Sequence, residues 1–495
     1  MSYTKFAARG ALIVLIISVF AGILGYVVRL VMARNLSIEE FGLFYAVFAF
    51  LSLLGVFKTF GFDRALIKFI PEFQHKSKDN LIKSSILYVI FTQIITNSII
   101  IILVYLFSNF LSIYFFHSQK AGIVLKLMAI AFFIDSFVNV LKFVFQGFKK
   151  IIFFAVIDII RMSVILIILI AGLKMNFGLF SPIFAYIIAP IILLVSFGWL
   201  FVRNVFPQFL TSSFAVNKEL IKDISRYGIF VMLSGTAAIV LGYTDTTILT
   251  YFKGVKDVAL YNVALPTAKI LANLPIAIGS VLLPLTSELW IKKKHELLKA
   301  GIESLYKYSF LTSFPLVLIM LSFSNLIIYV LFGKEYILAA NAMRILSVGM
   351  IFYTYHFINV NFFLGIGQPQ IQSKILYIAA TFNIIADIIL IPMFGIIGAA
   401  ITTTASFFIM MILGLMQIKN FITIELPIKI WVRALLAGAF FLILVALLKK
   451  LISLNVWIET ALVLTIAGFV YIATLFLLKV IEFDELKELH RRVFK

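Results

Sequence analysis

Three basic side chains lie within long apolar stretches of the sequence, at Arg29, Lys58 and Lys269. A charged group inside a lipid bilayer costs about 2.5–3.5 kcal/mol on insertion scales, so it normally faces protein or water rather than acyl chains. Arginine and lysine bind phosphate groups through charge-assisted hydrogen bonds. A cavity lined by these side chains would attract anions, so we assign the three residues to the binding site of an anionic substrate.

Two of the three residues have an alternative role because of where they lie. Arg29 is about one helical turn from the end of its apolar stretch, and Lys58 is close to the end of another. Either side chain could instead extend to the lipid headgroups. Lys269 lies deep in its stretch, between Pro266 and Pro275. Backbone loosened by proline needs protein or water around it, which favours a functional role for Lys269.

Arg161 is a fourth basic candidate for the substrate site. Asp158 stands three residues before it, and on a helix this spacing places both side chains on the same face. An ion pair between Asp158 and Arg161 is therefore the favoured interpretation. Substrate binding by Arg161 is the alternative.

Asp245 is alone among apolar neighbours, which makes it the candidate site for a coupling ion, Na⁺ or H⁺. Asp135 is a second candidate for this role. Its four-residue spacing from Asn139 also suits a polar contact between helices, and the same holds for Asn383 and Asp387.

His356 and Asn359 lie three residues apart in another apolar stretch. Together with Asn139, they are candidates for the polar lining of a cavity. A buried, hydrogen-bonded histidine is the favoured interpretation of His356, and proton transfer is the alternative.

The composition is that of a membrane protein. Of the 495 residues, 63% are hydrophobic and only 13% are charged, whereas soluble proteins average about 45–50% apolar and about 25% charged residues. The net charge of +20 then belongs beside anionic headgroups, which argues against a nucleic-acid partner. There is no cysteine, so disulfides and thiolate metal sites are excluded. We also find no nucleotide-binding or zinc-protease motif and assign no catalytic residue, metal site or cofactor.

We expect an all-α integral membrane protein with 14 transmembrane helices, because a spanning helix needs about 20 apolar residues. The expected spans, in approximate limits, are residues 10–33, 42–60, 83–107, 121–146, 151–173, 180–203, 224–250, 258–289, 305–331, 340–364, 373–392, 396–418, 430–448 and 456–478. With this alternation, more than twice as many Lys and Arg residues fall on the side of the N-terminus as on the other. The positive-inside rule therefore places both termini in the cytoplasm, in a multi-pass protein of the cell membrane.

The chain contains signs of an internal duplication. Leu24-Gly25-Tyr26 matches Leu241-Gly242-Tyr243, and Phe177-Gly178-Leu179 matches Phe394-Gly395-Ile396, both at an offset of 217 residues. We therefore expect two pseudo-symmetric six-helix lobes, at residues 1–210 and 211–420, followed by two extra helices and a tail at 421–495. Two lobes of equal orientation enclose a substrate path between them, which is typical of transporters.

The segment from Ala33 to Phe44 (ARNLSIEEFGLF), followed by Gly61-Phe62-Asp63-Arg64-Ala65, resembles the multidrug/oligosaccharidyl-lipid/polysaccharide exporter superfamily. The resemblance is greatest to its polysaccharide-transporter branch, the Wzx-like flippases. It implies alternating-access translocation of a polyprenyl-(di)phosphate-linked oligosaccharide across the cytoplasmic membrane, for surface polysaccharide or glycan biosynthesis. It further implies that membrane lipids and glycan-assembly proteins are partners.

In related lipid-linked precursor flippases, cationic side chains on spans one, two and eight line the central cavity and meet the phosphate. Arg29, Lys58 and Lys269 fall on those three spans of this chain. The resemblance therefore supports their assignment to the substrate site.

Two other classes of protein stay open. A drug or cation antiporter coupled to Na⁺ or H⁺ would use an acidic site in span one or seven, and only Asp245 in span seven is available. A multi-span glycosyltransferase would need acidic residues on a sizeable outer loop. The longest outer connection expected, residues 107–119, contains no acidic residue, which argues against the enzyme.

Overall fold

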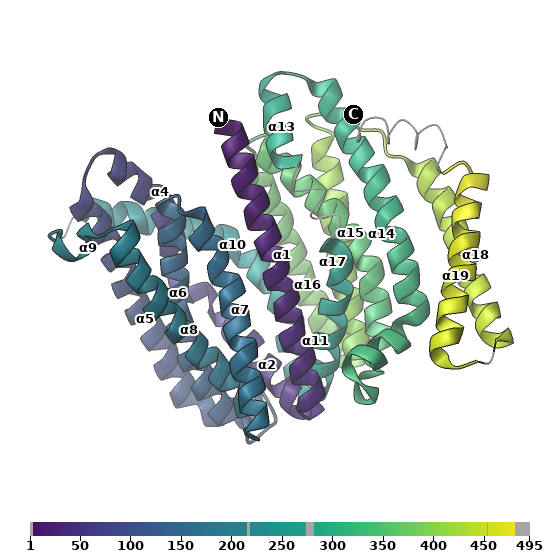
Figure 1. The fold of residues 1–495 in the computed structure, drawn as a ribbon, viewed down its shortest axis with the longest axis horizontal. Helices are drawn as coiled ribbons and strands as arrows, with labels where there is room; N and C mark the ends of the chain where they lie inside the picture. Colours follow the sequence, from purple (N-terminus) through teal and green to yellow (C-terminus); the bar gives the residue numbers. More distant parts are fainter. Residues whose placement is uncertain (1–2, 215–217, 274–281, 453, 481–495) are drawn as a thin grey trace. The chain divides into compact units, whose positions relative to one another are not determined.

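The computed structural model describes residues 3–214, 218–273, 282–452 and 454–480, and this part of the chain contains helices and no strand (Figure 1). The α-helices are α1 (Tyr3–Asn35), α2 (Ile38–Leu54), α3 (Val56–Thr59), α4 (Phe62–His75), α5 (Asp79–Tyr114), α6 (Ala121–Gly147), α7 (Ile151–Lys174), α8 (Phe180–Leu200), α9 (Gln208–Thr211), α10 (Lys218–Lys253), α11 (Val255–Lys269), α13 (Leu282–Ile291), α14 (His295–Phe332), α15 (Ala339–Gly365), α16 (Pro369–Phe394), α17 (Ile396–Ile418), α18 (Ile428–Leu451) and α19 (Val456–Leu477).

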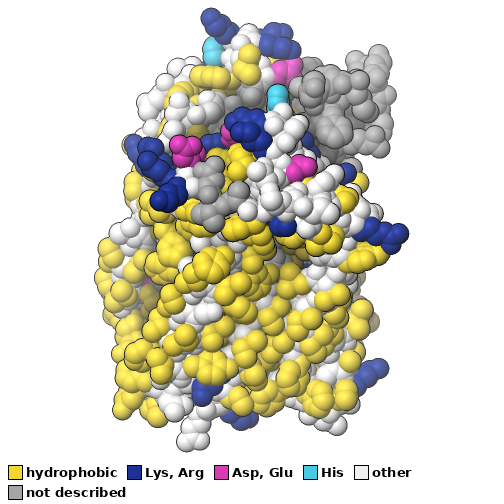
Figure 2. All heavy atoms as spheres, turned by 90° about the vertical axis from the view of Figure 1, so that its left-hand side faces the viewer, with side chains coloured by type: hydrophobic (Ala, Val, Ile, Leu, Met, Phe, Trp, Pro, Cys, Tyr) yellow, Lys and Arg dark blue, Asp and Glu magenta, His cyan; other side chains and the backbone are white. Residues whose placement is uncertain are grey.

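Among the described residues, 11 helices are long and apolar enough to cross a membrane, and the bent pair formed by α2 with α3 and α4 raises this to 12. On the face shown in Figure 2, hydrophobic side chains form a continuous band, and most charged side chains lie beyond one end of it. The chain is therefore an all-helical, multi-pass membrane protein, as the composition predicts. The count of 14 spans stays a prediction.

The chain divides into two compact units. The first comprises residues 1–266, 328–342 and 376–406, and the second comprises residues 267–327, 343–375 and 407–495. Within the first unit, α1 packs against α7, and α6 packs against both α5 and α8. The long α10 of this unit crosses α2 and α4. Within the second unit, α18 packs against α19. The division into two six-helix lobes and two extra helices stays a prediction.

The second apolar stretch is broken where the sequence places a glycine-rich turn. α2 ends at Leu54, and after the single turn of α3 the backbone is left-handed at Phe60 and Gly61, with φ of 47° and 72°. A Cβ at Gly61 would overlap the carbonyl oxygen of Gly228 on α10, so a glycine is required there. The amphipathic α4 follows, and it buries its apolar face against α5, α6 and α10.

Two expected stretches have different limits in the structure. The helix expected over residues 258–289 is interrupted, because α11 ends at Lys269 and a 3₁₀ turn follows at Ile270–Ala272. Pro266 has no N–H to donate to the preceding turn, which weakens the helix at this point. Pro275 lies outside the described residues. The outer connection expected at 107–119 was wrong at its start, since the apolar run continues and α5 extends to Tyr114.

Gly42, within the Glu-Phe-Gly-Leu motif, allows α2 to approach α11. A Cβ at this position would overlap the carbonyl oxygen of Val255, the first residue of α11. Ser37 and Glu40 fix the start of α2 through a capping box. The motif thus starts a helix and supplies its closest packing contact.

The substitution Gly42→Ala should lower the stability of the purified protein by about 1–3 kcal/mol, because two backbones must move apart to admit the methyl group. Thermal unfolding in detergent measures this change. Gly22→Ala is the matched control, since no described atom lies within 4 Å of the added Cβ. Equal melting temperatures for the Gly42→Ala variant and the unmodified protein would contradict the packing argument.

Candidate functional site

Arg29 is held inside the first unit rather than extended to the lipid headgroups. Its Nη1 donates a hydrogen bond of 2.5 Å to the backbone carbonyl of Asn262 on α11. The guanidinium also lies over the ring of Tyr45, 4.1 Å from the ring centroid. A cation stacked on an aromatic face keeps part of its charge available to an anion. The headgroup alternative for Arg29 is therefore wrong in this structure.

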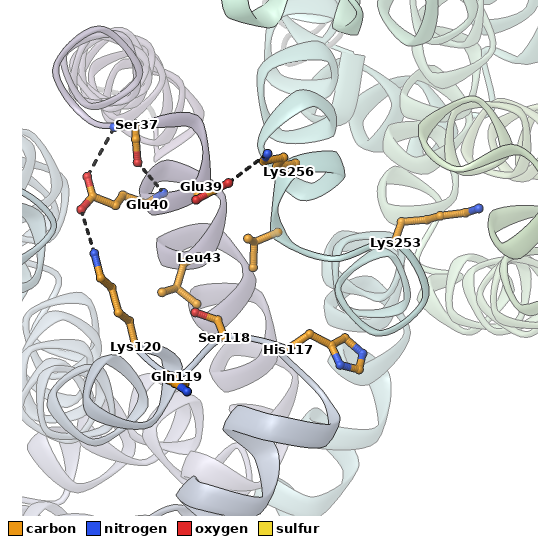
Figure 3. Close-up of a pocket in the computed structure, with 11 residues that line it drawn as sticks. Ser37, Glu39, Glu40, Leu43, His117, Ser118, Gln119, Lys120, Lys253 and Lys256 are labelled. Atoms are coloured by element: carbon orange, nitrogen blue, oxygen red, sulfur yellow. Dashed lines mark hydrogen bonds and ion pairs between the residues drawn. The ribbon is translucent and has the colours of Figure 1, made fainter.

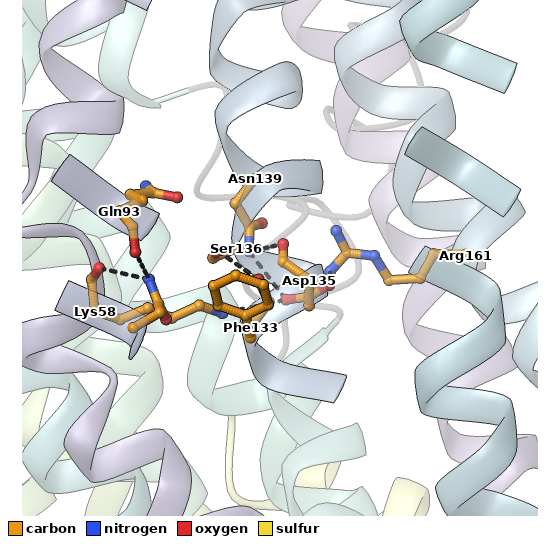
Figure 4. A network of polar contacts seen from close by, with 8 residues as sticks. Lys58, Gln93, Phe133, Asp135, Ser136, Asn139 and Arg161 are labelled. Atoms are coloured by element: carbon orange, nitrogen blue, oxygen red, sulfur yellow. Dashed lines mark hydrogen bonds and ion pairs between the residues drawn. The ribbon is translucent and has the colours of Figure 1, made fainter. Parts of the chain in front are cut away.

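Lys58 and Arg161 share one carboxylate, that of Asp135. Figure 4 shows Asp135 between the two basic side chains. The Nζ of Lys58 lies 3.7 Å from Oδ2 of Asp135, and Nη1 of Arg161 lies 3.2 Å from Oδ1. Asn139, on the same helix, donates a 3.0 Å hydrogen bond to Oδ2. We call Lys58, Asp135 and Arg161 the ion triad.

The helix break after α2 positions Lys58 in the ion triad. Lys58 lies on α3 and is buried, with 9% of its surface exposed. Because the helix does not continue past Thr59, the carbonyl of Lys58 needs other donors. Thr96 and Asn97 of α5 supply them, at 2.9 and 3.2 Å. These contacts anchor the backbone of Lys58 within the first unit.

The ion pair expected between Asp158 and Arg161 was wrong. Arg161 pairs with Asp135 of α6, and Asp158 forms an ion pair with Lys142, also of α6. A neighbouring helix offers these charges partners in better position than residues on their own helix. Two ion pairs therefore link α6 to α7, and only the one with Arg161 belongs to the ion triad.

A cavity of about 250 Å³ lies beside the ion triad within the first unit. Arg161 and Asp135 line it together with the hydroxyl-bearing residues Ser52, Tyr186 and Tyr243. The remaining walls are mostly apolar and include two phenylalanines and a proline. Such a site, mostly apolar with a few charged and hydroxyl groups, is typical of pockets that bind small polar groups.

A second buried cluster surrounds Asp245. Tyr261 of α11 and Thr403 of α17 both donate hydrogen bonds to Oδ2 of Asp245, which is 4% exposed. Asp387 of α16 is fully buried, accepts a hydrogen bond from Thr402, and lies close enough to Asp245 for the two carboxyl groups to interact electrostatically. One oxygen of each carboxyl group has no hydrogen-bond partner among the described residues. Two such carboxyl groups form a pair suited to a bound proton or cation.

The other predicted residues belong to the second unit. His356 is buried and its Nε2 lies 3.3 Å from Nε2 of Gln372, in agreement with a hydrogen-bonded core histidine. Asn359 accepts a hydrogen bond from Tyr306. Lys269 is exposed at the end of α11. The assignments of these residues to a substrate cavity stay predictions.

A second pocket, of about 500 Å³, lies at the start of α2 (Figure 3). Two ion pairs lie at its rim, since Lys120 lies 3.6 Å from Glu40 and Lys256 lies 2.9 Å from Glu39. These side chains are mostly exposed, so each pair is worth little. The buried site beside the ion triad is therefore the stronger candidate.

Sequence reasoning missed several partners of the predicted residues. Asn262, Tyr45 and Tyr261 carry no charge and occur in apolar stretches, where spacing alone assigns them no role. The run Thr402-Thr403-Thr404 was the one visible signal, because three consecutive hydroxyl groups in an apolar span need hydrogen-bond partners.

Comparison with known families decides the identity of the chain. The profile of a family described as polysaccharide biosynthesis protein matches residues 7–290. The chain belongs to this family. A second profile, MatE, matches residues 236–389 of the chain. Together the two matches place the chain in the multidrug/oligosaccharidyl-lipid/polysaccharide exporter superfamily.

Individual relatives agree with the family. An uncharacterized membrane protein of Methanocaldococcus jannaschii is 35% identical over the full length of both chains. A probable low-salt glycan biosynthesis flippase of Haloferax volcanii is 25% identical over 41% of this chain and 43% of its own. The lipid II flippase MurJ, in an inward closed conformation, has a similar fold, with a TM-score of 0.76 and 17% identity over 93% of this chain and 97% of its own.

The substitution Asp135→Asn should lower the stability of this family member by about 3 kcal/mol, because it leaves two buried cations without their anion. Thermal unfolding in detergent is the measurement. Asp158→Asn is the matched control, since it removes an anion from a single cation, Lys142, and should cost less. An equal or smaller loss for Asp135→Asn would contradict the account of the ion triad.

Proposed function

We propose that this protein is a flippase that translocates a polyprenyl-(di)phosphate-linked oligosaccharide from the cytoplasmic to the outer leaflet of the cell membrane, for surface polysaccharide or glycan biosynthesis. The ion triad beside its cavity carries this proposal. Two cations and one anion leave a net positive charge in a buried site, and Arg29 adds a third basic group in the same unit. Such a site attracts a phosphate.

The membrane topology belongs to the same proposal. Eleven or 12 membrane-capable helices are described, and α15 with the interrupted α11–α13 segment would complete 14 spans with both termini in the cytoplasm. The headgroup would bind between two lobes while the polyprenyl tail stays in lipid. Rocking of the lobes would then expose the headgroup outside. The flippase named among the relatives supports this use of the fold.

We further propose that Na⁺ or H⁺ drives the cycle at Asp245. The unpartnered oxygens of Asp245 and Asp387 fit a bound cation, because two buried carboxylates repel each other unless a positive charge lies between them. Hydroxyl groups of Tyr261 and Thr403 would hold Asp245 in place. Glycan-assembly proteins would supply and consume the lipid-linked substrate.

A drug or cation antiporter is the second candidate, favoured by the MatE match to residues 236–389. Its cargo is cationic, whereas the ion triad beside the cavity of the first unit carries a net positive charge. Efflux of cationic dyes by the reconstituted protein, together with loss of this efflux in the Asp245→Asn variant, would support the antiporter.

Removal of the charges of Arg29 and Lys269 together, by Arg29→Gln and Lys269→Gln, should abolish translocation of a fluorescent polyprenyl-diphosphate sugar by proteoliposomes. Each substitution removes one of the basic groups assigned to the phosphate, and a charge-assisted contact is worth about 1.5–3 kcal/mol. Lys450→Gln, at the exposed end of α18, is the control and should leave the rate unchanged. Translocation at the unmodified rate by the double variant would refute the phosphate site.

The substitution Asp245→Asn should abolish the dependence of translocation on a Na⁺ or H⁺ gradient, because an amide cannot exchange a cation as a carboxylate does. The rate under an imposed gradient, compared with the rate without one, measures the effect. Asp158→Asn, which lies outside the carboxyl pair, should retain the dependence. A variant at Asp245 that still responds fully to the gradient would place the coupling site elsewhere.

A further inference from the structure

The ion triad contains hydrogen-bond donors that have no acceptor among the described residues. Arg161 contacts Asp135 through Nη1, whereas its Nε and Nη2 are buried and have no hydrogen-bond partner among the described residues. These two nitrogens form the side edge of the guanidinium, which binds two oxygens of a phosphate or carboxylate at once. Buried donors without partners are costly. Their presence points to an acceptor that arrives from outside the chain.

The contact of Lys58 with Asp135 is also loose. At 3.7 Å it is an ion pair without the geometry of a hydrogen bond. The Nζ of Lys58 lies 5.4 Å from the ring centroid of Phe132, which lines the cavity. Lys58 therefore lies next to a residue of the cavity wall and is held to Asp135 by charge without a hydrogen bond.

Asp135 has a partner that does not depend on the cations. Asn139, one turn further along α6, donates a 3.0 Å hydrogen bond to its Oδ2. When Lys58 or Arg161 moves to another anion, this contact remains and keeps the carboxylate from being left without a donor. The cavity of about 250 Å³ beside these residues has room for several waters or one small anionic group.

We infer that the cavity beside the ion triad binds an oxyanion of the cargo, and that Asp135 is the internal anion that this oxyanion replaces. Without cargo, Asp135 pairs with Lys58 and with Nη1 of Arg161. The cargo oxyanion first binds Nε and Nη2 of Arg161 and then binds Lys58. This inference rests on the proposed function, and it deepens that function by naming a positioning residue. Competition by Asp135 weakens binding, which allows the cargo to leave on the other side of the membrane.

The oxyanion has two sources in a lipid-linked glycan, the (di)phosphate and the carboxylate of an acidic sugar. Both present paired oxygens to a guanidinium edge. Inorganic diphosphate and glucuronate are soluble probes for the two sources, and glucose is the uncharged control. Binding of each probe to the purified full-length protein is measured in detergent by titration calorimetry and by the shift in melting temperature.

The Asp135→Asn variant should bind diphosphate or glucuronate at least about tenfold more tightly than the unmodified protein, because an amide no longer competes for the cations. The bound anion should also restore part of its lost thermal stability. The probe that shows the larger gain identifies the source. Asp158→Asn should bind both probes as the unmodified protein does.

A second variant keeps the inference testable if Asp135→Asn fails to fold. Arg161→Lys retains a charge opposite Asp135 but has no side edge for two oxygens, so it should bind the preferred probe about tenfold more weakly at similar stability. Equal affinity of Arg161→Lys and the unmodified protein would overturn the inference. So would an Asp135→Asn variant that binds both anions no more tightly than the unmodified protein does.

Soluble probes separate this inference from the proposed function. If the unmodified protein translocates the lipid-linked sugar but the Asp135→Asn variant binds no anion more tightly, the flippase function is supported and the inferred role of Asp135 is rejected. If the Asp135→Asn variant binds an anionic probe more tightly but no lipid-linked sugar is translocated, the anion site is supported and the cargo is of another class.

Discussion

The cost of a charge inside a lipid bilayer is the constraint on which this structure depends. The protein must provide the partners that water would otherwise provide, and it must do so from neighbouring helices. In the first unit, Asp135 neutralises part of the charge of Lys58 and Arg161. Removing Asp135 would leave two buried cations without an anion, whereas removing either cation would leave a neutral ion pair. The ion triad is thus both a link among α3, α6 and α7 and a reserve of positive charge.

The local backbone follows from the same constraint. A continuous helix through Lys58 would keep its carbonyl within the helix, whereas the turn at Phe60 and Gly61 exposes it to α5. Polar residues of α5 then donate hydrogen bonds to this carbonyl, so no water is needed there. The span is also bent by 44° where α2 meets α3, and a break of this kind is where a span can change its bend. The helix that carries Lys58 is therefore attached through hydrogen bonds that a rearrangement can exchange.

Much of the fold could be predicted from the sequence, and the site only in part. Long apolar runs such as residues 151–173 specify helices because composition and length suffice. The contact between Asp135 and Asn139 was predictable because both lie on one helix. The partners of Arg161 and Asp245 were not, because they come from other helices, and spacing along the chain carries no information on which helix faces are opposed. The pairing of Arg161 with Asp135 of α6, instead of with Asp158, is an example of such a partner.

Membership of the polysaccharide biosynthesis protein family and the net positive charge of the ion triad are both consistent with the anionic cargo proposed above. The most direct test of this account compares two substrates that differ only in charge. One is a fluorescent disaccharide on polyprenyl diphosphate, and the other is the same disaccharide joined to the same lipid through an uncharged linker. Proteoliposomes that contain the unmodified protein should translocate the charged lipid at least about tenfold faster, since the cations attract the diphosphate and not the uncharged linker. Equal rates for the two lipids would contradict the claim that the buried cations recognise the cargo.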